Sequence, residues 1–272
     1  MRKLLLVALA IGLLAAAGCS THSPVSSTQG TVRITMTDAP GEFDAVNLVV
    51  TQVAIHRGLA DSLETEGMED SVSGWEILSD TPATYDLLAL RNGVFTTIAE
   101  GLVPAGHYTQ IRLKLGPGSN VVVDGTTYPL TVPSGLQSGY KLVGEFDVPA
   151  SGLVELALDF DAARSVHRTG AGRYMLKPTV RVMPPYDVGG IKGTIVPDST
   201  AAWGYAIAGT DTVAATMPAL DGSFAFVLLT PGSYDVAIDV EAPLRDTTLA
   251  AVPVTAQSFT DLGEILLQYL ED

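Results

Sequence analysis

The sequence predicts an all-β protein made of two tandem antiparallel β-sandwich domains. Across the 272 residues, apolar side chains alternate with polar ones in short runs, the period of a strand with one buried face. These runs recur at intervals of roughly 8–12 residues and are separated by turns rich in Gly and Pro. Sustained helical periodicity is absent beyond the N-terminal apolar run. This combination is typical of β-sandwiches.

The first two strands follow directly from this alternation. Residues 31–37 place their apolar side chains on one face, and residues 38–41 form a turn. A second strand covers residues 46–55, where the parity of the apolar positions changes near Thr51 and Gln52. Such a change requires one extra residue in the strand, so we expect a β-bulge there.

The middle of the first domain is less regular. Residues 58–74 hold an acidic insertion that we expect to be a surface loop. Residues 85–93 fit either a strand or one helical turn that ends at Asn92-Gly93. Alternation resumes at residues 107–115, and Asp124-Gly125 between two apolar runs predicts a hairpin. Further strands are expected at residues 75–78, 142–148, 153–160 and 174–183.

Residues 184–190 contain two prolines followed by two glycines and form the best domain boundary. We therefore place the first domain at residues 31–185 and the second at 186–272. Strand-like alternation restarts after this boundary. Residues 187–272 hold 12 Asp and Glu against 2 Lys and Arg, a net charge of −10.

The two halves share a short turn motif. In each half a turn that contains Pro and Gly is followed by a strand that has a tyrosine near its start. The two runs are residues 102–108, with Tyr108, and residues 229–234, with Tyr234. A tyrosine at such a corner can donate a hydrogen bond back to the preceding backbone, as in Greek-key sandwiches. The motif indicates either a common origin of the two halves or a frequent type of turn used twice.

The N-terminus resembles a bacterial lipoprotein signal peptide. Two basic residues precede an apolar run, and Ala16-Ala17-Gly18-Cys19 matches a lipobox, with Ala16 where Leu is usual. The run is shorter than the about 20 residues of a transmembrane helix and ends in small residues. The resemblance implies that residues 1–18 are a cleaved signal and that Cys19, the only cysteine, carries the lipid, palmitate among its acyl chains. Residues 19–30, rich in Ser and Thr, are then a flexible tether.

This resemblance also predicts the location of the protein. It implies export and a lipid anchor in the bacterial cell envelope. Ser20 stands beside Cys19, where an Asp commonly retains lipoproteins at the inner membrane, so we expect the outer membrane or the cell surface.

Residues 30–183 resemble the bacterial and archaeal family known as domain of unknown function 4382. The shared runs are residues 37–41, 86–90, 104–113, 133–135, 158–161 and 176–182. The family has no established activity, so the resemblance implies a β-rich, exported domain.

Residues 188–268 resemble a carboxypeptidase regulatory-like domain, which has a transthyretin-like, carbohydrate-binding-like fold. The shared runs are residues 190–195, 221–226 and 229–236. The resemblance implies a non-catalytic spacer, stabiliser or carbohydrate-binding-like module.

Charge and motifs exclude several classes of function. The net charge of −15 repels phosphate backbones, so we expect no nucleic-acid partner. It also argues against electrostatic adsorption to anionic lipid. The four histidines have no metal-ligand spacing, and neither a nucleophile elbow nor a phosphate loop occurs. We therefore expect a protein that is not an enzyme and has no required cofactor.

The most suggestive polar group is Asp159 with Asp161, which we expect on the solvated face of one strand. Asp38 and Asp86 could approach them and complete a calcium site of carboxylate ligands. The alternative is cross-strand pairing with basic residues, for which the candidates are Arg112, Lys114, Lys177 and Arg181. Paired carboxylates could also serve a glycoside hydrolase, but no sequence feature marks one as an acid of raised pKa.

Aromatic side chains are the other candidates for a binding site. Trp203 and Tyr205 share one parity near the start of the second domain and could stack on sugar rings, as could Trp75 and Tyr186. Core or inter-domain packing is the more ordinary role of such residues.

From these observations we expect a non-enzymatic cell-envelope lipoprotein that acts as a binding or structural module. Its partners would be the membrane, through lipidated Cys19, and a glycan or an envelope protein. A carbohydrate-binding second domain is one alternative, and a hydrolase with paired carboxylates is the other.

Overall fold

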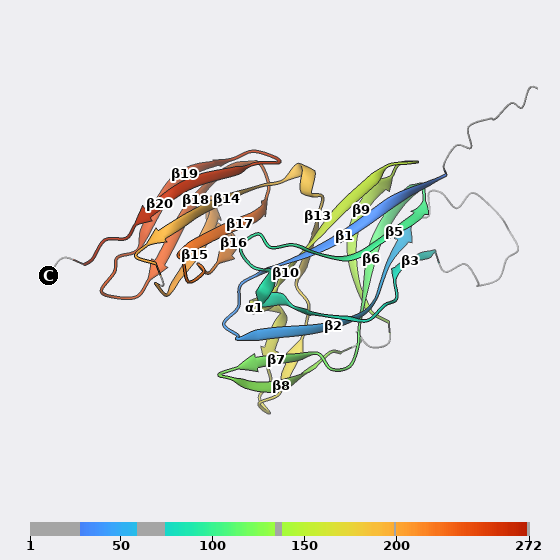
Figure 1. Cartoon of the computed structure of the whole chain (residues 1–272), viewed down its shortest axis with the longest axis horizontal. Helices are drawn as coiled ribbons and strands as arrows, with labels where there is room; N and C mark the ends of the chain where they lie inside the picture. Colours follow the sequence, from blue (N-terminus) through green and yellow to red (C-terminus); the bar gives the residue numbers. More distant parts are fainter. Residues whose placement is uncertain (1–27, 59–73, 134–137, 199, 271–272) are drawn as a thin grey trace, which may run out of the picture.

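The computed structural model describes residues 28–58, 74–133, 138–198 and 200–270, and these form an all-β protein, as predicted. Figure 1 shows two groups of sheets joined by a short connection. The predicted signal peptide, Cys19, most of the tether and nearly all of the acidic insertion at 58–74 lie outside the described residues.

Two sheets make up the first group, which we call the first sandwich. One is four-stranded, in the order β13-β10-β1-β5, and the other is nine-stranded, in the order β11-β12-β8-β7-β2-β6-β9, with β3 and β4 also paired to β2. Their bounds are β1 Gln29–Ala39, β2 Ala45–Arg57, β3 Trp75–Ser79, β4 Ala83–Asp86, β5 Thr96–Pro104, β6 Gly106–Leu115, β7 Asn120–Val123, β8 Thr126–Thr131, β9 Tyr140–Val148, β10 Leu153–Asp161, β11 Val166–Arg168, β12 Tyr174–Leu176 and β13 Val180–Met183.

The second group, the second sandwich, also has two sheets, in the orders β17-β14-β20 and β16-β15-β18-β19. Their bounds are β14 Gly189–Val196, β15 Ala202–Ala208, β16 Asp211–Thr216, β17 Ser223–Leu229, β18 Gly232–Val240, β19 Thr247–Val254 and β20 Phe259–Leu266. Three short helical turns complete the described chain: η2 Leu87–Leu90, α1 Ala162–Ser165 and η3 Pro185–Asp187. The proposed domain boundary at residue 185 falls in η3.

The sheets are not purely antiparallel, which corrects the prediction. β1 pairs with β10, β8 with β12 and β14 with β20 in parallel. Alternation in a sequence shows which face of a strand is buried but not which strand it pairs with. Parallel partners are joined through long connections, so no local turn signal announces them.

Several local predictions are confirmed. The register of β2 against β6 shifts between Val50 and Gln52, where the β-bulge was expected. β7 and β8 form the predicted hairpin, and its turn residues Asp124 and Gly125 both have positive φ, 50° and 69°. Two positive φ values match the right-handed twist of the flanking strands. The ambiguous residues 85–93 begin as the end of β4 and continue as the single turn η2.

Both predicted tyrosine corners are present. The hydroxyl of Tyr108 donates to the carbonyl of Pro104 at 2.8 Å, and that of Tyr234 donates to the carbonyl of Thr230 at 2.7 Å. Both tyrosines are buried in the core of their own sandwich. A buried phenol requires such a partner, and the same four-residue spacing supplies it twice.

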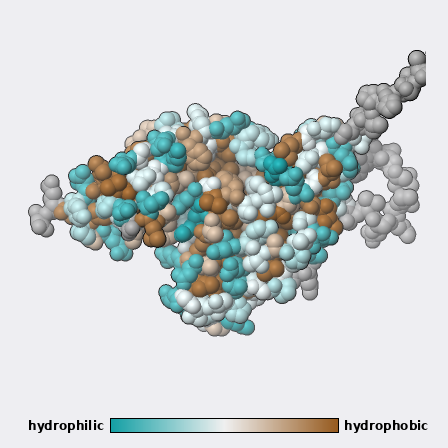
Figure 2. All heavy atoms as spheres, in the orientation of Figure 1, coloured by the Kyte–Doolittle hydropathy of each residue, from teal (hydrophilic) through white to brown (hydrophobic). Residues whose placement is uncertain are grey.

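Each sandwich has its own apolar core, and a third cluster joins them. The joining cluster contains Ala157 of β10, Val188 and Leu228 of β17, with Met183 and Val227 packed against it. In the space-filling view the atoms of the two sandwiches form a continuous surface on the side shown (Figure 2). One face of β10 is therefore covered by the second sandwich.

Candidate functional site: a cavity between the two sandwiches

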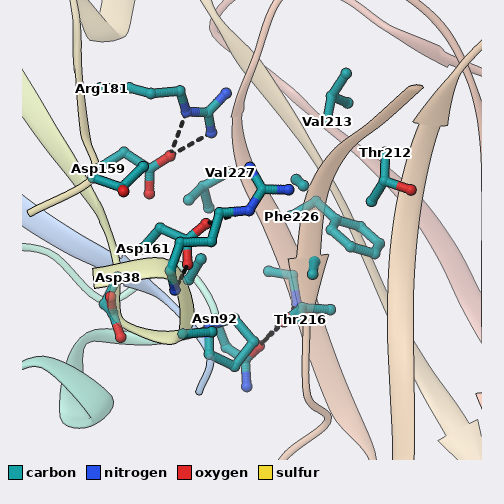
Figure 3. A pocket seen from close by; sticks show the side chains of 18 of the residues that line it. Asp38, Asn92, Asp159, Asp161, Arg181, Thr212, Val213, Thr216, Phe226 and Val227 are labelled. Atoms are coloured by element: carbon teal, nitrogen blue, oxygen red, sulfur yellow. Dashed lines mark hydrogen bonds and ion pairs between the residues drawn. The ribbon is translucent and has the colours of Figure 1, made fainter. Parts of the chain in front are cut away.

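A cavity of about 270 Å³ lies where the two sandwiches meet. Figure 3 shows side chains of the first sandwich on one side and strands of the second sandwich on the other. The first sandwich contributes polar groups from the ends of β1, β10 and β13, and β16 and β17 contribute a mainly apolar wall. The residues used below are Asp38, Asn92, Asp159, Asp161, Arg181 and Trp203.

Strand β10 is buried on both faces in its second half. Leu156, Leu158 and Phe160 point into the first core, as predicted. Ala157 and Asp159, on the other face, are only 0% and 8% exposed. The expectation of a solvated face for Asp159 is therefore wrong, because the second sandwich covers it.

Asp159 forms a close ion pair with Arg181, its cross-strand neighbour on β13. Both Nε and Nη2 of Arg181 donate to Oδ2 of Asp159, with the Nε distance 2.9 Å (Figure 3). Burial raises the pKa of the Asp159 carboxyl, and the opposing effect of Arg181 is smaller. This pair is the cross-strand alternative weighed in the sequence, with Arg181 as the partner among the four candidates.

Asp161 caps the short turn α1. Its Oδ1 accepts from the backbone N–H of Arg164 at 2.8 Å, and its Oδ2 lies 3.5 Å from Nε of the same arginine. Capping a helical turn with an Asp side chain satisfies an N–H that the turn itself leaves free. The structure therefore gives Asp161 a local structural role at the rim of the cavity.

Asp38, at the end of β1, is the most confined carboxyl of the cavity. It is 4% exposed, its Oδ1 accepts from the N–H of Ala162 at 3.0 Å, and its Oδ2 has no hydrogen-bond partner among the described residues. Burial raises the pKa of Asp38 well above its usual range, and the nearby Asp159 and Asp161 raise it further. No feature of the sequence around Asp38 indicates this raised pKa.

Asp86 does not join these carboxyls. Its Oδ1 accepts from the N–H groups of Leu88 and Val46, so it caps η2 beside the nine-stranded sheet. Among the described residues, no group of three or more His, Cys, Asp or Glu is placed to hold a metal ion. With Asp159 bound to Arg181 and Asp86 elsewhere, the four predicted ligands do not converge.

Trp203 and Tyr205 lie on the outer face of β15, on one parity as predicted. Their rings are nearly parallel, 12° apart, with centroids separated by 6.3 Å. Trp203 lines the cavity. Burial raises the pKa of Tyr205, as do the carboxylates of Asp239 and Glu42. The Trp203 end of this pair therefore lies at the junction.

The other two aromatic candidates lie elsewhere. Trp75 packs against Arg112 and His56 on the outer face of the nine-stranded sheet. Tyr186, in η3, is 51% exposed and lies beside Gln257, whose Nε2 donates to its carbonyl at 3.2 Å.

Asn92 is the functional residue that sequence reasoning missed. Its Oδ1 accepts from Oγ1 of Thr216 at 2.6 Å and from the N–H of Ala225 at 3.5 Å, while its Nδ2 donates to the carbonyl of Met217 at 3.1 Å (Figure 3). All three partners belong to the second sandwich. The Asn-Gly dipeptide predicts a turn, but nothing in the sequence indicates that the Asn92 side chain reaches the other sandwich.

Comparison with protein families supports the resemblance of the first domain to domain of unknown function 4382. The model of the family described as Domain of unknown function (DUF4382) matches residues 29–178. A search of the curated proteins found no match. Among the described residues, no helix is both long enough and apolar enough to cross a bilayer.

The comparison with solved structures found matches of low structural similarity to this chain. The TIE protein of Bacillus anthracis is 11% identical, with 89% of this chain and 34% of that chain covered and a TM-score of 0.23. The minor pilin GBS52 of Streptococcus agalactiae is 9% identical, with 88% and 97% covered and a TM-score of 0.24. The shaft pilin spaA of Lactobacillus rhamnosus GG is 8% identical, with 90% and 99% covered and a TM-score of 0.24. Likeness at this level carries no conclusion about function.

Proposed function

The chain belongs to the DUF4382 family, whose description assigns no activity, and we propose from its own residues that it is a non-enzymatic cell-envelope lipoprotein acting as a binding module. The observation that carries this proposal is the cavity between the sandwiches, since it is lined by polar groups of one and apolar groups of the other. Ligand sites are commonly found at such domain junctions. Cys19 would anchor the protein, and the tether would hold the cavity away from the membrane.

The geometry favours binding over catalysis. A hydrolase with paired carboxylates needs an acid of raised pKa within reach of the substrate. Asp38 has the raised pKa, but its free oxygen is buried, and Asp159 is tied to Arg181. The groups that reach the open part of the cavity, such as Arg181 and Trp203, are suited to holding a ligand.

A carbohydrate is the ligand class with a specific observation in its favour. Trp203 offers a partly exposed ring, and the Asp159–Arg181 pair offers charged donors and acceptors on the same cavity. Rings contact the apolar faces of sugars, and planar charged groups bind their hydroxyls. The site would then belong to both sandwiches, not to the second domain alone.

A glycan array with the soluble chain tests the carbohydrate proposal. We expect binding of a defined set of glycans that is lost in Trp203→Ala and kept in Tyr186→Ala, which removes an exposed aromatic ring outside the cavity. Circular dichroism would confirm that both variants keep their sheets. No binding across a broad array, or equal loss in both variants, would contradict it.

Mass spectrometry of the mature protein tests the anchor separately. We expect an N-terminal Cys19 carrying diacylglycerol and fatty-acyl mass, and no such mass in Cys19→Ser. An unmodified N-terminus in the native host would remove the lipoprotein part of the proposal and leave the cavity proposal standing.

A further inference from the structure

A cationic surface with an indole at its centre lies on the outer face of strands β3, β2, β6 and β9. We propose that this surface, which we call the Trp75 face, docks the first sandwich on the anionic headgroups of a lipid membrane. The Trp75 face consists of His56, Trp75, Arg112, Lys114 and Lys141. None of these residues lines the cavity between the sandwiches.

Sheet register brings the cations together. Arg112 and Lys141 are cross-strand partners on β6 and β9, and Lys114 lies two residues further along β6. Alternate residues of a strand share one face, so Arg112 and Lys114 point the same way. The face therefore presents three cationic side chains within two adjacent strands.

Trp75 is the centre of this group. The guanidinium carbon of Arg112 lies 4.1 Å from the centroid of its ring, and Nζ of Lys141 lies 5.8 Å from it. The ring of His56 meets the indole edge-on at 4.9 Å. These contacts hold the two cations over the ring by cation–π attraction, so their arrangement is fixed before any ligand arrives.

The charge of the face is not neutralised by the described part of the chain. Arg33, Arg164, Arg181 and Lys192 all form ion pairs with carboxylates, whereas no ion pair joins Arg112, Lys114 or Lys141 to a described residue. The residues in register with these three, Ala54 and Gln52 on β2, are uncharged.

This local charge modifies the expectation drawn from composition. A net charge of −15 argues against adsorption to anionic lipid only if all charges act together. At physiological ionic strength, exposed charges more than about 8 Å apart are largely screened from each other. A surface in contact with the membrane therefore responds most strongly to the charges nearest to it, and on the Trp75 face these include Arg112, Lys114 and Lys141.

Exposed aliphatic side chains favour a membrane over a soluble acidic polymer. Ile77 on β3 is 56% exposed and Val143 on β9 is 81% exposed, and both lie on strands of this face. Tryptophan, aliphatic side chains and flanking Lys or Arg are the composition of surfaces that rest in a membrane interface. A polyanion in water would gain little from the two aliphatic groups.

The proposed tether is long enough to allow this contact. The backbone N–H of Ala105 donates to the carbonyl of Thr28, so the described chain begins beside the start of β6. Arg112 lies six residues along β6 from Gly106, about 20 Å at the rise of a strand. Eight residues lie between Cys19 and Thr28, and the nine steps along the chain span up to about 30 Å when extended. The argument for proximity thus relies on the lipid anchor proposed above.

Vesicles to which the chain is coupled through Cys19 test the docking. Cys19 is the only cysteine, so a maleimide lipid attaches the chain from Cys19 onward at one site, whatever its modification in the cell. Trp203→Phe leaves Trp75 as the only tryptophan. We expect brominated lipids to quench Trp75 in vesicles that contain phosphatidylglycerol, and much less in vesicles of phosphatidylcholine alone.

The cations should be required for this quenching. We expect docking to weaken about fivefold for each basic residue removed, in Arg112→Gln and in Lys141→Gln, and to fall at high salt. Lys192→Gln, which removes a cation paired with Asp261 in the second sandwich, is the matched control and should change nothing.

Two results would overturn the proposal. The first is that Trp75 stays unquenched, or is quenched equally in both kinds of vesicle, which would show that anionic headgroups play no part. Alternatively, Arg112→Gln and Lys141→Gln could lower the melting temperature of the free protein and leave the quenching unchanged. In that case the cations serve the protein's own carboxylates instead of a membrane.

Discussion

At the scale of single residues, Asp38 shows how far burial changes a side chain that the sequence presents as an ordinary turn residue. It follows an alternating strand and precedes Ala39-Pro40-Gly41, a pattern typical of an exposed turn. The structure buries it against Ala162, and one of its carboxyl oxygens has no hydrogen-bond partner in the described part of the chain. Because a charged carboxylate without full hydrogen bonding is costly to bury, its pKa rises.

We expect Asp38→Asn to stabilise the protein at neutral pH. A raised folded-state pKa means that the folded protein binds a proton more tightly than the unfolded chain, so stability falls as the pH rises through that pKa. The amide cannot ionise and escapes this loss, and its oxygen can still accept from Ala162. Thermal melting at several pH values should show a higher melting temperature for the variant at pH 7 and a gap that closes near pH 4.

Asp80→Asn, which removes the same charge from an exposed site, is the control and should leave the melting temperature nearly unchanged. If Asp38→Asn is less stable than the wild type at neutral pH, the result would contradict this prediction. It would show that the folded state is stabilised by the ionised Asp38 side chain and not by the protonated one.

The two tyrosine corners give a second prediction at this scale. Tyr234→Phe removes a hydroxyl that bonds to both the carbonyl and Oγ1 of Thr230, and it leaves the ring in place. We expect a loss of about 1 kcal/mol in the free energy of unfolding, because the variant loses the hydrogen bond between the buried tyrosine and the backbone. Urea unfolding measures it, and Tyr186→Phe, at an exposed ring, is the control. An unchanged free energy would mean that water replaces the hydroxyl.

At the scale of elements, β10 contributes the two carboxylates Asp159 and Asp161 to the site. It pairs in parallel with β1 and antiparallel with β13, and this arrangement places Asp159 beside Arg181. The alternation of Val154, Leu156 and Leu158 correctly predicts which face enters the first core. It does not predict that the opposite face is covered as well, since a half-polar pattern normally indicates solvent.

Because Asp159 on β10 is paired with Arg181, we expect that calcium does not stabilise the folded protein. Asp159 already has a cationic partner, and Asp86 caps a turn away from the cavity, so the carboxylates cannot surround an ion. Thermal melting with millimolar calcium and then with a chelator should give the same melting temperature, because only a ligand of the folded state raises it. A rise that Asp159→Asn and Asp161→Asn abolish would contradict this and establish a calcium site.

At the scale of the whole molecule, the described part of the junction contains an apolar cluster and the hydrogen-bonded side chain of Asn92. Leu228 and Val188 pack on Ala157, and Asn92 reaches across to Thr216 and Met217. The backbone of Asn92 has a φ of 55°, a conformation that Asn adopts more readily than most residues. Both the positive φ of the backbone and the hydrogen bonds of the side-chain amide therefore favour Asn at this position.

We expect Asn92→Gly to loosen the junction without disturbing either core. Glycine accepts the positive φ, so the variant loses only the hydrogen bonds to the second sandwich. A decrease of about 1–3 kcal/mol in the free energy of unfolding is expected for these contacts. NMR relaxation should also show the two sandwiches tumbling more independently. Asn120→Ala, within the first sandwich, is the comparison, since its partner Asn47 lies in the same sheet. Unchanged tumbling in Asn92→Gly would assign the junction to the apolar cluster alone.

Local physics in the sequence determined the all-β class, the strand faces, the bulge at Thr51-Gln52, the Asp124-Gly125 hairpin and the tyrosine corners. These features depend on neighbours within a few residues, so period and turn chemistry are enough to predict them. Only the tertiary structure decided the parallel pairings, the covered face of β10 and the burial of Asp38. It also decided the hydrogen bonds that the Asn92 side chain forms with the second sandwich. Each of these joins residues far apart in the chain, and a single sequence carries no signal for which distant surfaces meet.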